Sequence, residues 1–251
     1  MNQLSKTALH YWDQLYHCPP PIHLPRGWGA GARNLQRLLR RYIKPGDKVL
    51  EIGAAPGIWL AWVAKTFGAS VAGLDFSPTG VALGQEFFRD QGLVGDWRCE
   101  DVFECSFSRG SFDVVYSNGF IEHFADPAAL VGLHLELVKP GGLALITVPN
   151  YRRLYGVLQR YFDPQNFETF FLDTMSIEAL RRLAPPLLAE KVEAYPFGRF
   201  DIGLLHIHRR WPRPIAMLLT HFFYLLSFLQ PVDIAVLCPL LVLAIRRKLD
   251  H

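Results

Sequence analysis

A glycine-containing turn carries the first chemical signal in the sequence. The segment Val49-Leu-Glu-Ile-Gly-Ala-Ala-Pro-Gly57 joins a short apolar run to a helical pattern. A strand that ends in a tight turn and continues as a helix lets the backbone approach a ligand at the carboxyl edge of a sheet. Gly53 and Gly57 lack Cβ atoms, so this turn can adopt unusual dihedral angles and a ligand can lie close to it.

The glycine spacing argues against two common nucleotide ligands. Gly53 and Gly57 give G-x-x-x-G, whereas dinucleotide sites have G-x-G-x-x-G. No Lys-Ser/Thr pair stands directly after Gly57, as a phosphate-binding loop requires. The turn therefore favours a ligand without a pyrophosphate, and it argues against an NAD-dependent oxidoreductase.

Acidic residues follow at the ends of the next two predicted strands. Asp75 lies 18 residues after Gly57 (75 minus 57), where a carboxylate can accept hydrogen bonds from ribose hydroxyls. An alternative role for Asp75, capping the next helix, suits Ser77 better because that helix begins at Pro78. Asp101, in Glu100-Asp-Val102, is placed to accept a hydrogen bond from an exocyclic amine.

The elements that must position these residues alternate regularly. Strands are predicted at Lys48–Ile52, Ser70–Asp75, Trp97–Val102, Phe112–Ser117 and Leu143–Val148, and helices at Ile58–Phe67, Pro78–Gln91 and Ala128–Val138. This alternation implies right-handed crossovers and a parallel sheet with helices on both faces. Helices are also predicted at Ser5–Tyr16 and Ala32–Tyr42. The Pro- and Gly-rich stretch between them, Cys18–Gly31, suits a lid over the site.

The pattern loosens after Pro149. Helices at Tyr151–Tyr161 and Ser176–Leu183 are predicted to form an insertion after the fifth strand. The apolar segment Ile215–Gln230 is interpreted as a buried helix, followed by a core strand at Ala235–Ile245. Both are shorter than the ~18 to 20 apolar residues that cross a bilayer. The alternative interpretation of this region is peripheral contact with a membrane surface or a hydrophobic substrate pocket.

Composition narrows the class of protein further. The 251 residues carry a net charge of only +3, and the basic residues occur in short bursts, so no nucleic-acid partner is expected. Four cysteines without a C-x-x-C pair predict neither a metal site nor a disulfide framework and suit a reducing compartment. The first residues lack an apolar signal-peptide core, and we expect a cytoplasmic location.

Five ordered motifs resemble those of class I S-adenosylmethionine-dependent methyltransferases over roughly residues 40 to 150. They are E-x-G-x-x-x-G from Glu51, the Asp75 segment, Glu100-Asp-Val102, Asp113-Val-Val-Tyr-Ser-Asn118 and Val138-Lys-Pro-Gly-Gly142. The resemblance implies an α/β, Rossmann-like, doubly wound sheet of seven strands whose last strand is antiparallel. It also implies S-adenosylmethionine as cofactor and S-adenosylhomocysteine as product. We expect a lid segment at 1–42, a cofactor-binding core at 43–150 and insertion helices with closing strands at 151–251, in one globular domain.

The same resemblance implies which residues hold the cofactor. Glu51, Gly53 and Gly57 would border its methionine end, Asp75 its ribose and Asp101 its adenine. Asn118 and Gly119 would pass beside the methionine. The full set of predicted cofactor residues is Glu51, Gly53, Ala54, Gly57, Asp75, Phe76, Asp101, Val102, Asn118 and Gly119.

Candidate catalytic residues follow the fourth strand. Ser117–Pro127 is similar to the E-H-F-x-D-P stretch of small-molecule methyltransferases that act on quinones and natural products. Methyl transfer is an in-line displacement on a sulfonium, for which alignment and exclusion of water matter most. A base is needed only if the acceptor must lose a proton; His123 suits this role by its pKa and Glu122 by its position. Structural roles for both remain open, with Glu122 positioning the next helix and His123 bonding to backbone.

The methyl acceptor should contact the variable parts of the chain. The predicted acceptor residues are Tyr11, Trp12, His23, Trp28, Tyr151 and Phe167. Their aromatic character predicts a small hydrophobic or amphipathic acceptor.

Two other functions stay open. Gly-Ala-Ala-Pro-Gly57 also resembles the cofactor loop of RNA ribose methyltransferases, which use a Lys-Asp-Lys-Glu tetrad. Asn118 stands where the Asp of that tetrad would end the fourth strand, and Leu143–Val148 contains no lysine. A cofactor-binding protein without catalysis is the second alternative, because such motifs establish binding and not turnover.

Overall fold

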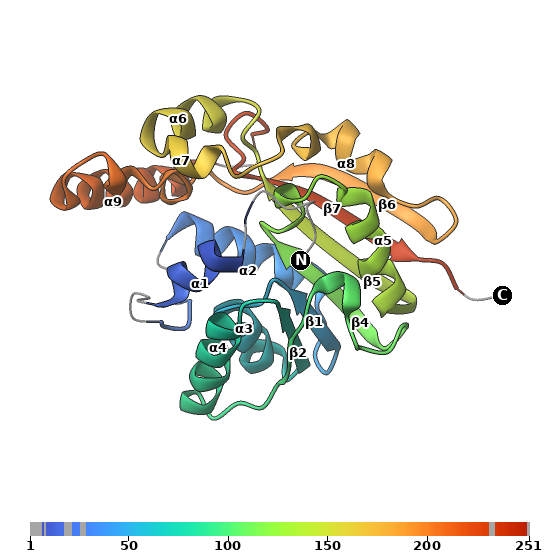
Figure 1. The fold of residues 1–251 in the computed structure, drawn as a ribbon. Coiled ribbons are helices and arrows are strands. Elements are labelled where there is room, and N and C mark those ends of the chain that lie inside the picture. Colours follow the sequence, from blue (N-terminus) through green and yellow to red (C-terminus); the bar gives the residue numbers. More distant parts are fainter. Residues whose placement is uncertain (1–6, 8, 18–21, 26–28, 231–233, 250–251) are drawn as a thin grey trace.

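A single seven-stranded sheet forms the centre of the molecule (Figure 1). The computed structural model describes residues 7, 9–17, 22–25, 29–230 and 234–249. The strands lie in the order β3-β2-β1-β4-β5-β7-β6, and β7 is antiparallel to both of its neighbours. Their bounds are β1 Lys48–Ile52, β2 Ser70–Asp75, β3 Asp96–Cys99, β4 Phe112–Asn118, β5 Val138–Pro149, β6 Ala189–Phe197 and β7 Leu240–Arg247. The predicted seven strands with an antiparallel last strand are confirmed.

Helices cover both faces of the sheet. They are α1 Leu9–His17, α2 Ala30–Tyr42, α3 Ile58–Phe67, α4 Pro78–Asp90, α5 Pro127–Leu137, α6 Leu154–Phe162, α7 Pro164–Phe167, α8 Ile177–Leu183 and α9 Arg213–Leu229. Leu38 and Leu39 of α2 pack with Leu60 of α3 and Val49 of β1 in one buried cluster. This arrangement is the expected doubly wound architecture.

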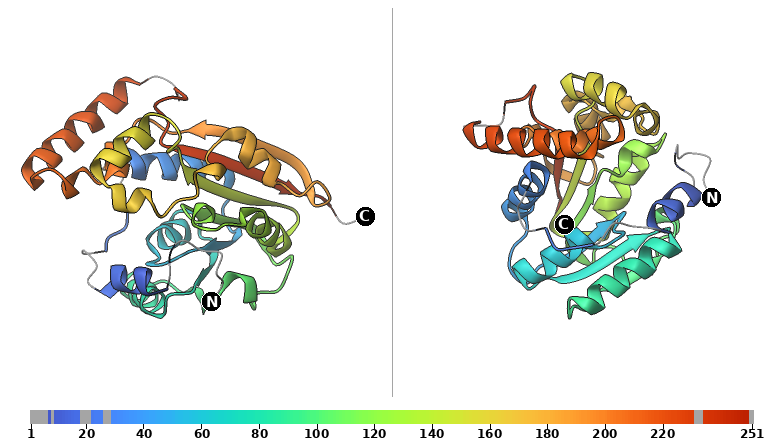
Figure 2. Two further views of the ribbon diagram at one scale, coloured as in Figure 1. Left: turned by 45° about the horizontal axis from the view of Figure 1, so that its top comes forward. Right: turned by 90° about the vertical axis from the view of Figure 1, so that its left-hand side faces the viewer.

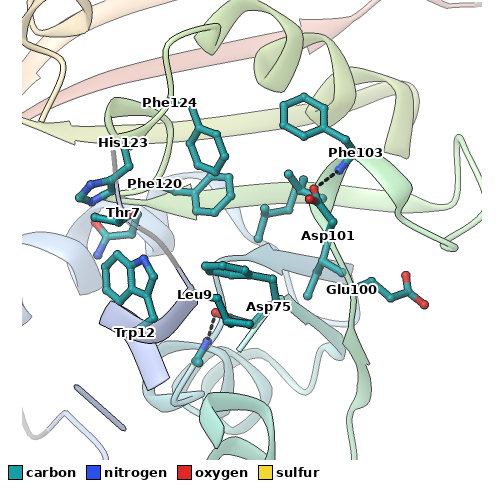
Figure 3. A pocket seen from close by; sticks show the side chains of 18 of the residues that line it. Thr7, Leu9, Trp12, Asp75, Glu100, Asp101, Phe103, Phe120, His123 and Phe124 are labelled. Carbon is teal, nitrogen blue, oxygen red and sulfur yellow. Dashed lines mark hydrogen bonds between the residues drawn. The ribbon is translucent and has the colours of Figure 1, made fainter. Parts of the chain in front are cut away.

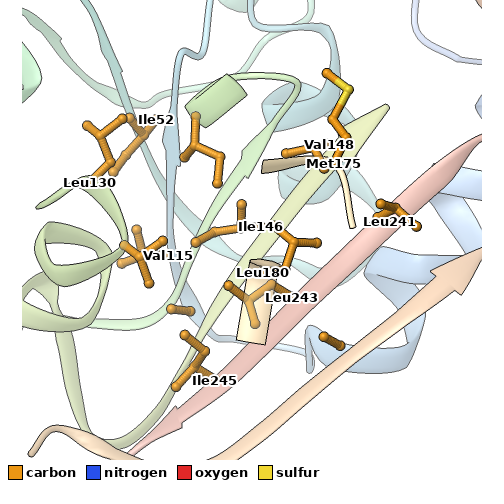
Figure 4. Close-up of a cluster of buried hydrophobic side chains, with 14 of the residues drawn as sticks. Ile52, Val115, Leu130, Ile146, Val148, Met175, Leu180, Leu241, Leu243 and Ile245 are labelled. Atoms are coloured by element: carbon orange, nitrogen blue, oxygen red, sulfur yellow. The ribbon is translucent and has the colours of Figure 1, made fainter. Parts of the chain in front are cut away.

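The second buried cluster occupies the opposite face. Leu50 and Ile52 of β1 point into it, on the side away from Val49, because successive strand side chains alternate. Leu130 of α5 lies beside Ile52 in this cluster, and Leu180 of α8 lies beside Ile146 and Leu243 (Figure 4). Each fully buried Leu or Ile contributes roughly 1.5–3 kcal/mol relative to its exposed state, so this face fixes the strand ends that carry the site.

Side-chain caps fix the starts of two helices beside the site. Ser77 accepts a hydrogen bond from the Gly80 N–H at the start of α4, as the sequence predicts. Asp126 accepts one from the Ala129 N–H at the start of α5. Both helices have proline in their first turn, where the missing N–H costs no hydrogen bond.

Several predicted boundaries are wrong for local reasons. The third strand ends at Cys99 and not at Val102, because Asp101 accepts a hydrogen bond from the Phe103 N–H and starts a 3-10 turn. The fifth strand begins at Val138, before the predicted Leu143. Strand β6 has no counterpart among the predicted elements. It lies at the sheet edge and pairs only with β7 among the described strands.

The apolar helix near the C-terminal end is not buried. Helix α9 occupies the predicted position, but within its bounds only Ala216 and Ser227 are buried, and most of its leucines and phenylalanines are exposed. An apolar run in the sequence shows that a helix is hydrophobic, but it does not show which neighbouring elements cover that helix. No helix in the described part of the chain is long and apolar enough to cross a membrane.

Candidate functional site

A cavity of about 390 Å³ opens at the carboxyl ends of β1, β2 and β4. We call it the first cavity. It is lined by Thr7, Leu9, Trp12, Tyr16, Ile52, Gly53, Ala55, Leu74, Asp75, Phe76, Glu100, Asp101, Val102, Phe103, Asn118, Gly119, Phe120, His123 and Phe124. In Figure 3, Asp101 and Glu100 lie toward one end, His123 and Trp12 toward the other, and Asp75 between them.

The turn after β1 forms the floor of this cavity. The Gly53 N–H donates a hydrogen bond to the Leu74 carbonyl at 2.8 Å, which ties the turn to β2. Gly53 has a φ of +74°, and a Cβ there would lie 2.8 Å from the Phe120 ring. Gly57 has a φ of +86°, and its Cβ would lie 2.8 Å from the Trp97 ring. Glycine is thus required at both positions, at Gly53 by the cavity wall and at Gly57 by packing behind the turn.

Asp75 contributes a buried carboxylate at the end of β2. Its oxygens accept hydrogen bonds from the Ala55 N–H at 3.1 Å and the Ser77 N–H at 3.0 Å. Burial raises its pKa despite these bonds. The Tyr16 hydroxyl donates to the Ala55 carbonyl at 3.0 Å, so α1 is attached to the same turn. The carboxylate is rigidly placed, and each oxygen retains further capacity to accept hydrogen bonds.

The end of β3 is organised by two acidic side chains. Asp101 accepts from the Phe103 N–H at 3.0 Å. Glu100 accepts from both the N–H and the hydroxyl of Ser106, at 2.8 and 2.6 Å. Those bonds are among the physical causes that lower the pKa of Glu100. The Phe103 side chain packs beside Asp101 as an apolar wall of the cavity.

A second cavity of about 330 Å³ adjoins the first. It is lined by Tyr11, Trp12, Leu15, Gly31, Asn34, Leu35, Trp59, Asn118, Gly119, Glu122, His123, Pro149, Tyr151, Asn166, Phe170, Asp201, Leu204, Arg209, Pro239 and Leu240. Trp12, Asn118, Gly119 and His123 line both cavities. The Asn118 oxygen accepts from the Thr147 hydroxyl at 2.7 Å, which fixes the amide at this boundary.

Glu122 is the most unusual group in the second cavity. Its side chain is fully buried, and among the described residues neither carboxylate oxygen has a hydrogen-bond partner. Burial raises its pKa to about 8. A Cβ on Gly119 would lie 3.4 Å from Glu122 Oε1, so the carboxyl group sits directly behind the backbone that lines both cavities. The Glu122 carbonyl accepts from the Phe171 N–H at 2.7 Å and fixes this backbone to the insertion.

His123 lies where the two cavities meet. Its Nδ1 is 3.1 Å from the Thr169 carbonyl, and because a carbonyl only accepts, Nδ1 carries the hydrogen. Nε2 is then left with a lone pair. Burial lowers the pKa of His123 to about 4, so the ring is neutral near pH 7. The ring centroid lies 4.9 Å from that of Phe170 and 5.5 Å from that of Trp12, which approaches edge-on.

Most of the predicted cofactor residues come together in the first cavity. Gly53, Asp75, Phe76, Asp101, Val102, Asn118 and Gly119 all line it. Glu51, Ala54 and Gly57 do not belong to its lining. Glu51 is buried beneath the turn beside Tyr116, where burial raises its pKa to about 8. The Ala54 N–H donates to the Leu74 carbonyl at 3.1 Å.

Only some of the predicted acceptor residues line the second cavity. Tyr11, Trp12 and Tyr151 line the second cavity. The Phe167 ring packs 6.1 Å from that of Tyr151, behind the lining. His23 is exposed and lines neither cavity. Trp28 lies outside the described residues.

Several lining residues were not predicted. Tyr16 lies one helical turn after Trp12, a spacing that could have indicated it. Phe120 and Phe124 flank the Glu122-His123 pair in sequence. Asn34, Asp201 and Arg209 carry no local signal, because folding brings them from distant segments to the second cavity.

Comparisons with known proteins support the same identification. Residues 23–185 match the family model described as "Methyltransferase domain". A phosphoethanolamine N-methyltransferase of Triticum aestivum is 30% identical over 51% of this chain and 27% of its own length. A ubiquinone biosynthesis O-methyltransferase of Rhodopseudomonas palustris is 26% identical over 73% of this chain and 68% of its own length.

The fold is also found among solved structures. The [4+2]-cyclase SpnF superposes with a TM-score of 0.65 and 18% identity, over 98% of this chain and 97% of its own. At that identity the likeness shows the fold alone. The family match covers well over half of the chain, and the first cavity has the glycine turn and strand-end carboxylates that an adenosine-containing cofactor needs. The chain belongs to the methyltransferase-domain family, within the class I S-adenosylmethionine-dependent methyltransferase superfamily.

Proposed function

We propose that this protein transfers a methyl group from S-adenosylmethionine to a small hydrophobic or amphipathic acceptor. The first cavity would hold the cofactor and the second the acceptor. The observation that carries this proposal is the junction at His123, where Trp12, Asn118 and Gly119 also line both cavities. Two ligands bound there would meet with their reacting atoms at this junction and away from bulk water.

The residues of the first cavity match the chemistry of the cofactor. The buried Asp75 carboxylate suits the two ribose hydroxyls, as at the end of the second strand in nucleotide-binding sheets. Asp101 would accept from the adenine amine, with Phe103 and Phe76 as apolar walls. Asn118 and Gly119 would line the path of the methionine portion. When bound, S-adenosylmethionine supplies an electrophilic methyl group on a sulfonium for in-line displacement.

The second cavity favours an acceptor with an aromatic or otherwise apolar body. Tyr11, Trp59, Tyr151 and Phe170 supply ring faces and edges, and Arg209 and Asp201 supply polar groups. The Asp163 carboxylate forms a salt bridge with the Arg209 guanidinium at 3.0 Å and partly neutralises its positive charge. This mixture of apolar walls and a few polar groups is typical of sites for small amphipathic molecules.

His123 is placed to receive a proton from the acceptor. His123 lies at the junction with Nδ1 bound to the Thr169 carbonyl, and burial keeps the ring neutral near pH 7, so the Nε2 lone pair is free to accept a proton. Glu122, whose pKa burial raises to about 8, lies behind the Gly119 backbone at this junction and would help to position it. The two related enzymes are named as an N- and an O-methyltransferase. Acceptors that carry N–H or O–H groups are therefore the proposed class, because they lose a proton during transfer.

The fold by itself leaves a second possibility. The superposed SpnF is named a [4+2]-cyclase, so a chain of this fold can have a different reaction, or bind the cofactor without turnover. Neither alternative transfers a methyl group to an acceptor. Detecting that transfer therefore distinguishes our proposal from both alternatives.

The test is transfer of labelled methyl groups to a panel of phenols, catechols and amines. We expect transfer to at least one apolar member, and a fall of about 100-fold in its kcat for His123→Gln. His17→Gln is the matched control, because His17 is an exposed histidine of α1 that lines neither cavity. Cofactor binding without transfer to any member would contradict methyl transfer to this class. Unchanged kcat in the His123 variant would contradict its role as base.

A further inference from the structure

Helix α9 exposes an apolar stripe that no described element covers. The stripe consists of Ile215, Leu218, Phe222, Leu225, Leu226 and Leu229, with exposed fractions of 48, 71, 53, 64, 40 and 77%. These positions follow i, i+3, i+7, i+10, i+11 and i+14, so they share one side of the helix. We call this side the outer face of α9. Figures 1 and 2 show α9 extending beyond the rest of the molecule.

Helix α9 is apolar on both its inner and its outer side. On the inner side Leu219 and Phe223 pack against the core beside the buried Ala216, whereas an ordinary surface helix presents polar residues on its outer side. Scattered apolar residues on a surface are normal, but a contiguous stripe marks a place where another apolar surface binds. The outer face therefore needs an apolar partner.

Polar contacts hold the helix in this orientation. Arg33 of α2 donates to the Ser227 hydroxyl at 2.6 Å, and its guanidinium lies 3.9 Å from the centroid of the Phe228 ring. Arg199 donates to the Ser227 carbonyl at 3.3 Å. The Phe200 N–H donates to the side chain of Gln230, directly after the helix, at 3.1 Å. Rotating α9 to bury its leucines would break these bonds, so the exposed outer face belongs to the folded state.

Charge points to one kind of apolar partner. Arg210 and Arg213 lie at the start of α9, and the helix itself contains no Asp or Glu. The nearby Arg209 is already paired with Asp163. An apolar stripe beside these two arginines matches the interface of an anionic bilayer, where acyl chains lie beneath negative headgroups. A dimer of this chain through the same face would cover the leucines, but α9 would offer those arginines no acidic partner.

We propose that the protein binds the surface of an anionic lipid bilayer through the outer face of α9. With 17 residues, the helix lies along the interface and does not span it. Leu204 and Arg209, in the segment that leads into α9, also line the second cavity. Bilayer binding would therefore bring the acceptor cavity close to amphipathic molecules dissolved in the membrane. The bilayer contact itself does not depend on the proposed reaction.

The test is co-sedimentation of the full chain with vesicles. We expect the protein to sediment with phosphatidylcholine vesicles that contain phosphatidylglycerol, and more weakly with phosphatidylcholine alone. The variant Leu218→Glu/Leu225→Glu should weaken binding by at least about tenfold, because both changes place charges in the acyl layer. The control Val94→Glu/Leu187→Glu changes two other exposed apolar residues, at 91 and 87% exposure, and should bind as the unchanged protein does.

A charge variant and a fold check complete the experiment. Arg213→Gln should reduce binding to the anionic vesicles by about fivefold, with little effect on neutral vesicles. Circular dichroism checks the fold, and Leu218→Ser/Leu225→Ser replaces the glutamate variant if that variant fails to fold. Failure of the unchanged protein to bind anionic vesicles, or equal binding by the folded α9 variants, would overturn the proposal. So would self-association that depends on Leu218 and Leu225 in a protein that does not bind vesicles.

Discussion

At the scale of single residues, the proposed cofactor site depends most on the buried carboxylate of Asp75. Asp75→Asn keeps the size of the side chain but removes its charge and one acceptor oxygen. Because hydrogen bonds to charged groups contribute about 1.5–3 kcal/mol, we expect S-adenosylmethionine to bind about 10- to 100-fold more weakly. Titration calorimetry measures this, and Asp96→Asn, at an exposed position of β3, is the control. Equal affinity in the two variants would remove Asp75 from the site.

The buried carboxyl group of Glu122 predicts how the stability of the protein depends on pH. Burial raises its pKa to about 8 from an ordinary 4.5, so the folded protein keeps a proton that the unfolded chain loses above pH 4.5. This contribution to stability is fully present below pH 4.5 and is lost as pH rises through about 8. Glu122→Gln should therefore flatten the fall in Tm over this pH window. A fall as steep as that of the exposed control Glu104→Gln would show that Glu122 is ionised in the folded state.

Residue types at strand ends were predictable from the sequence, and residues from remote segments were not. Gly53, Asp75, Asp101, Asn118 and Gly119 were predicted to lie together, and all five line the first cavity. Each of them ends a strand or follows it by one or two residues, at one edge of the sheet. Residues of the second cavity such as Asn34, Asp201 and Arg209 come from α2 and from the segment after β6. Their positions depend on tertiary packing that local patterns do not record.

At the scale of elements, α1 acts as a cover shared by both cavities. Trp12 and Tyr16 line the first cavity, and Tyr11 and Leu15 the second. We expect S-adenosylhomocysteine to slow hydrogen exchange in α1 by on the order of tenfold, because the bound ligand adds contacts that local opening must break. Helix α8 contributes no lining residue and serves as the internal control. Equal slowing in both helices, or in neither, would contradict the role of α1 as a cover.

Alanine substitutions at two helical glycines are expected to change stability in opposite directions. A Cβ at Gly156 of α6 would overlap the Tyr151 carbonyl oxygen, so Gly156→Ala requires the backbone to move. A Cβ at Gly132 of α5 would meet nothing within 4 Å. We expect Gly156→Ala to lower the free energy of unfolding by about 1–3 kcal/mol and Gly132→Ala to raise it by ~0.5–1 kcal/mol. Urea denaturation measures both, and changes of the same sign would contradict the packing around Tyr151.

Element prediction succeeded where a strand is buried on both faces and failed at the edges. Strands β1, β2 and β4 are mostly buried and were placed to within one residue. Edge strand β6 has the exposed Glu190 and Lys191 directly after its first residue, which gives it a weak apolar pattern. Helix α9 was located correctly, but its burial was predicted wrongly because periodicity identifies an apolar face without showing what covers it.

At the scale of the whole molecule, the sheet brings three separate parts of the chain to one edge. The strand ends supply the first cavity, α1 covers it, and the segments after β5 and β6 complete the second. Seven strands with an antiparallel last strand were predicted once the motifs were recognised, whereas the order in which the strands lie comes from the structure. The division of the chain at residues 42 and 150 remains a prediction.

The most direct test of this account is a crystal structure of the protein with S-adenosylhomocysteine. We predict that the ribose hydroxyls contact Asp75, the adenine lies beside Asp101 and Phe103, and the sulfur lies at the His123 junction facing the second cavity. Binding of the adenosine portion in the second cavity, or a sulfur directed away from His123, would contradict the assignment of the two cavities.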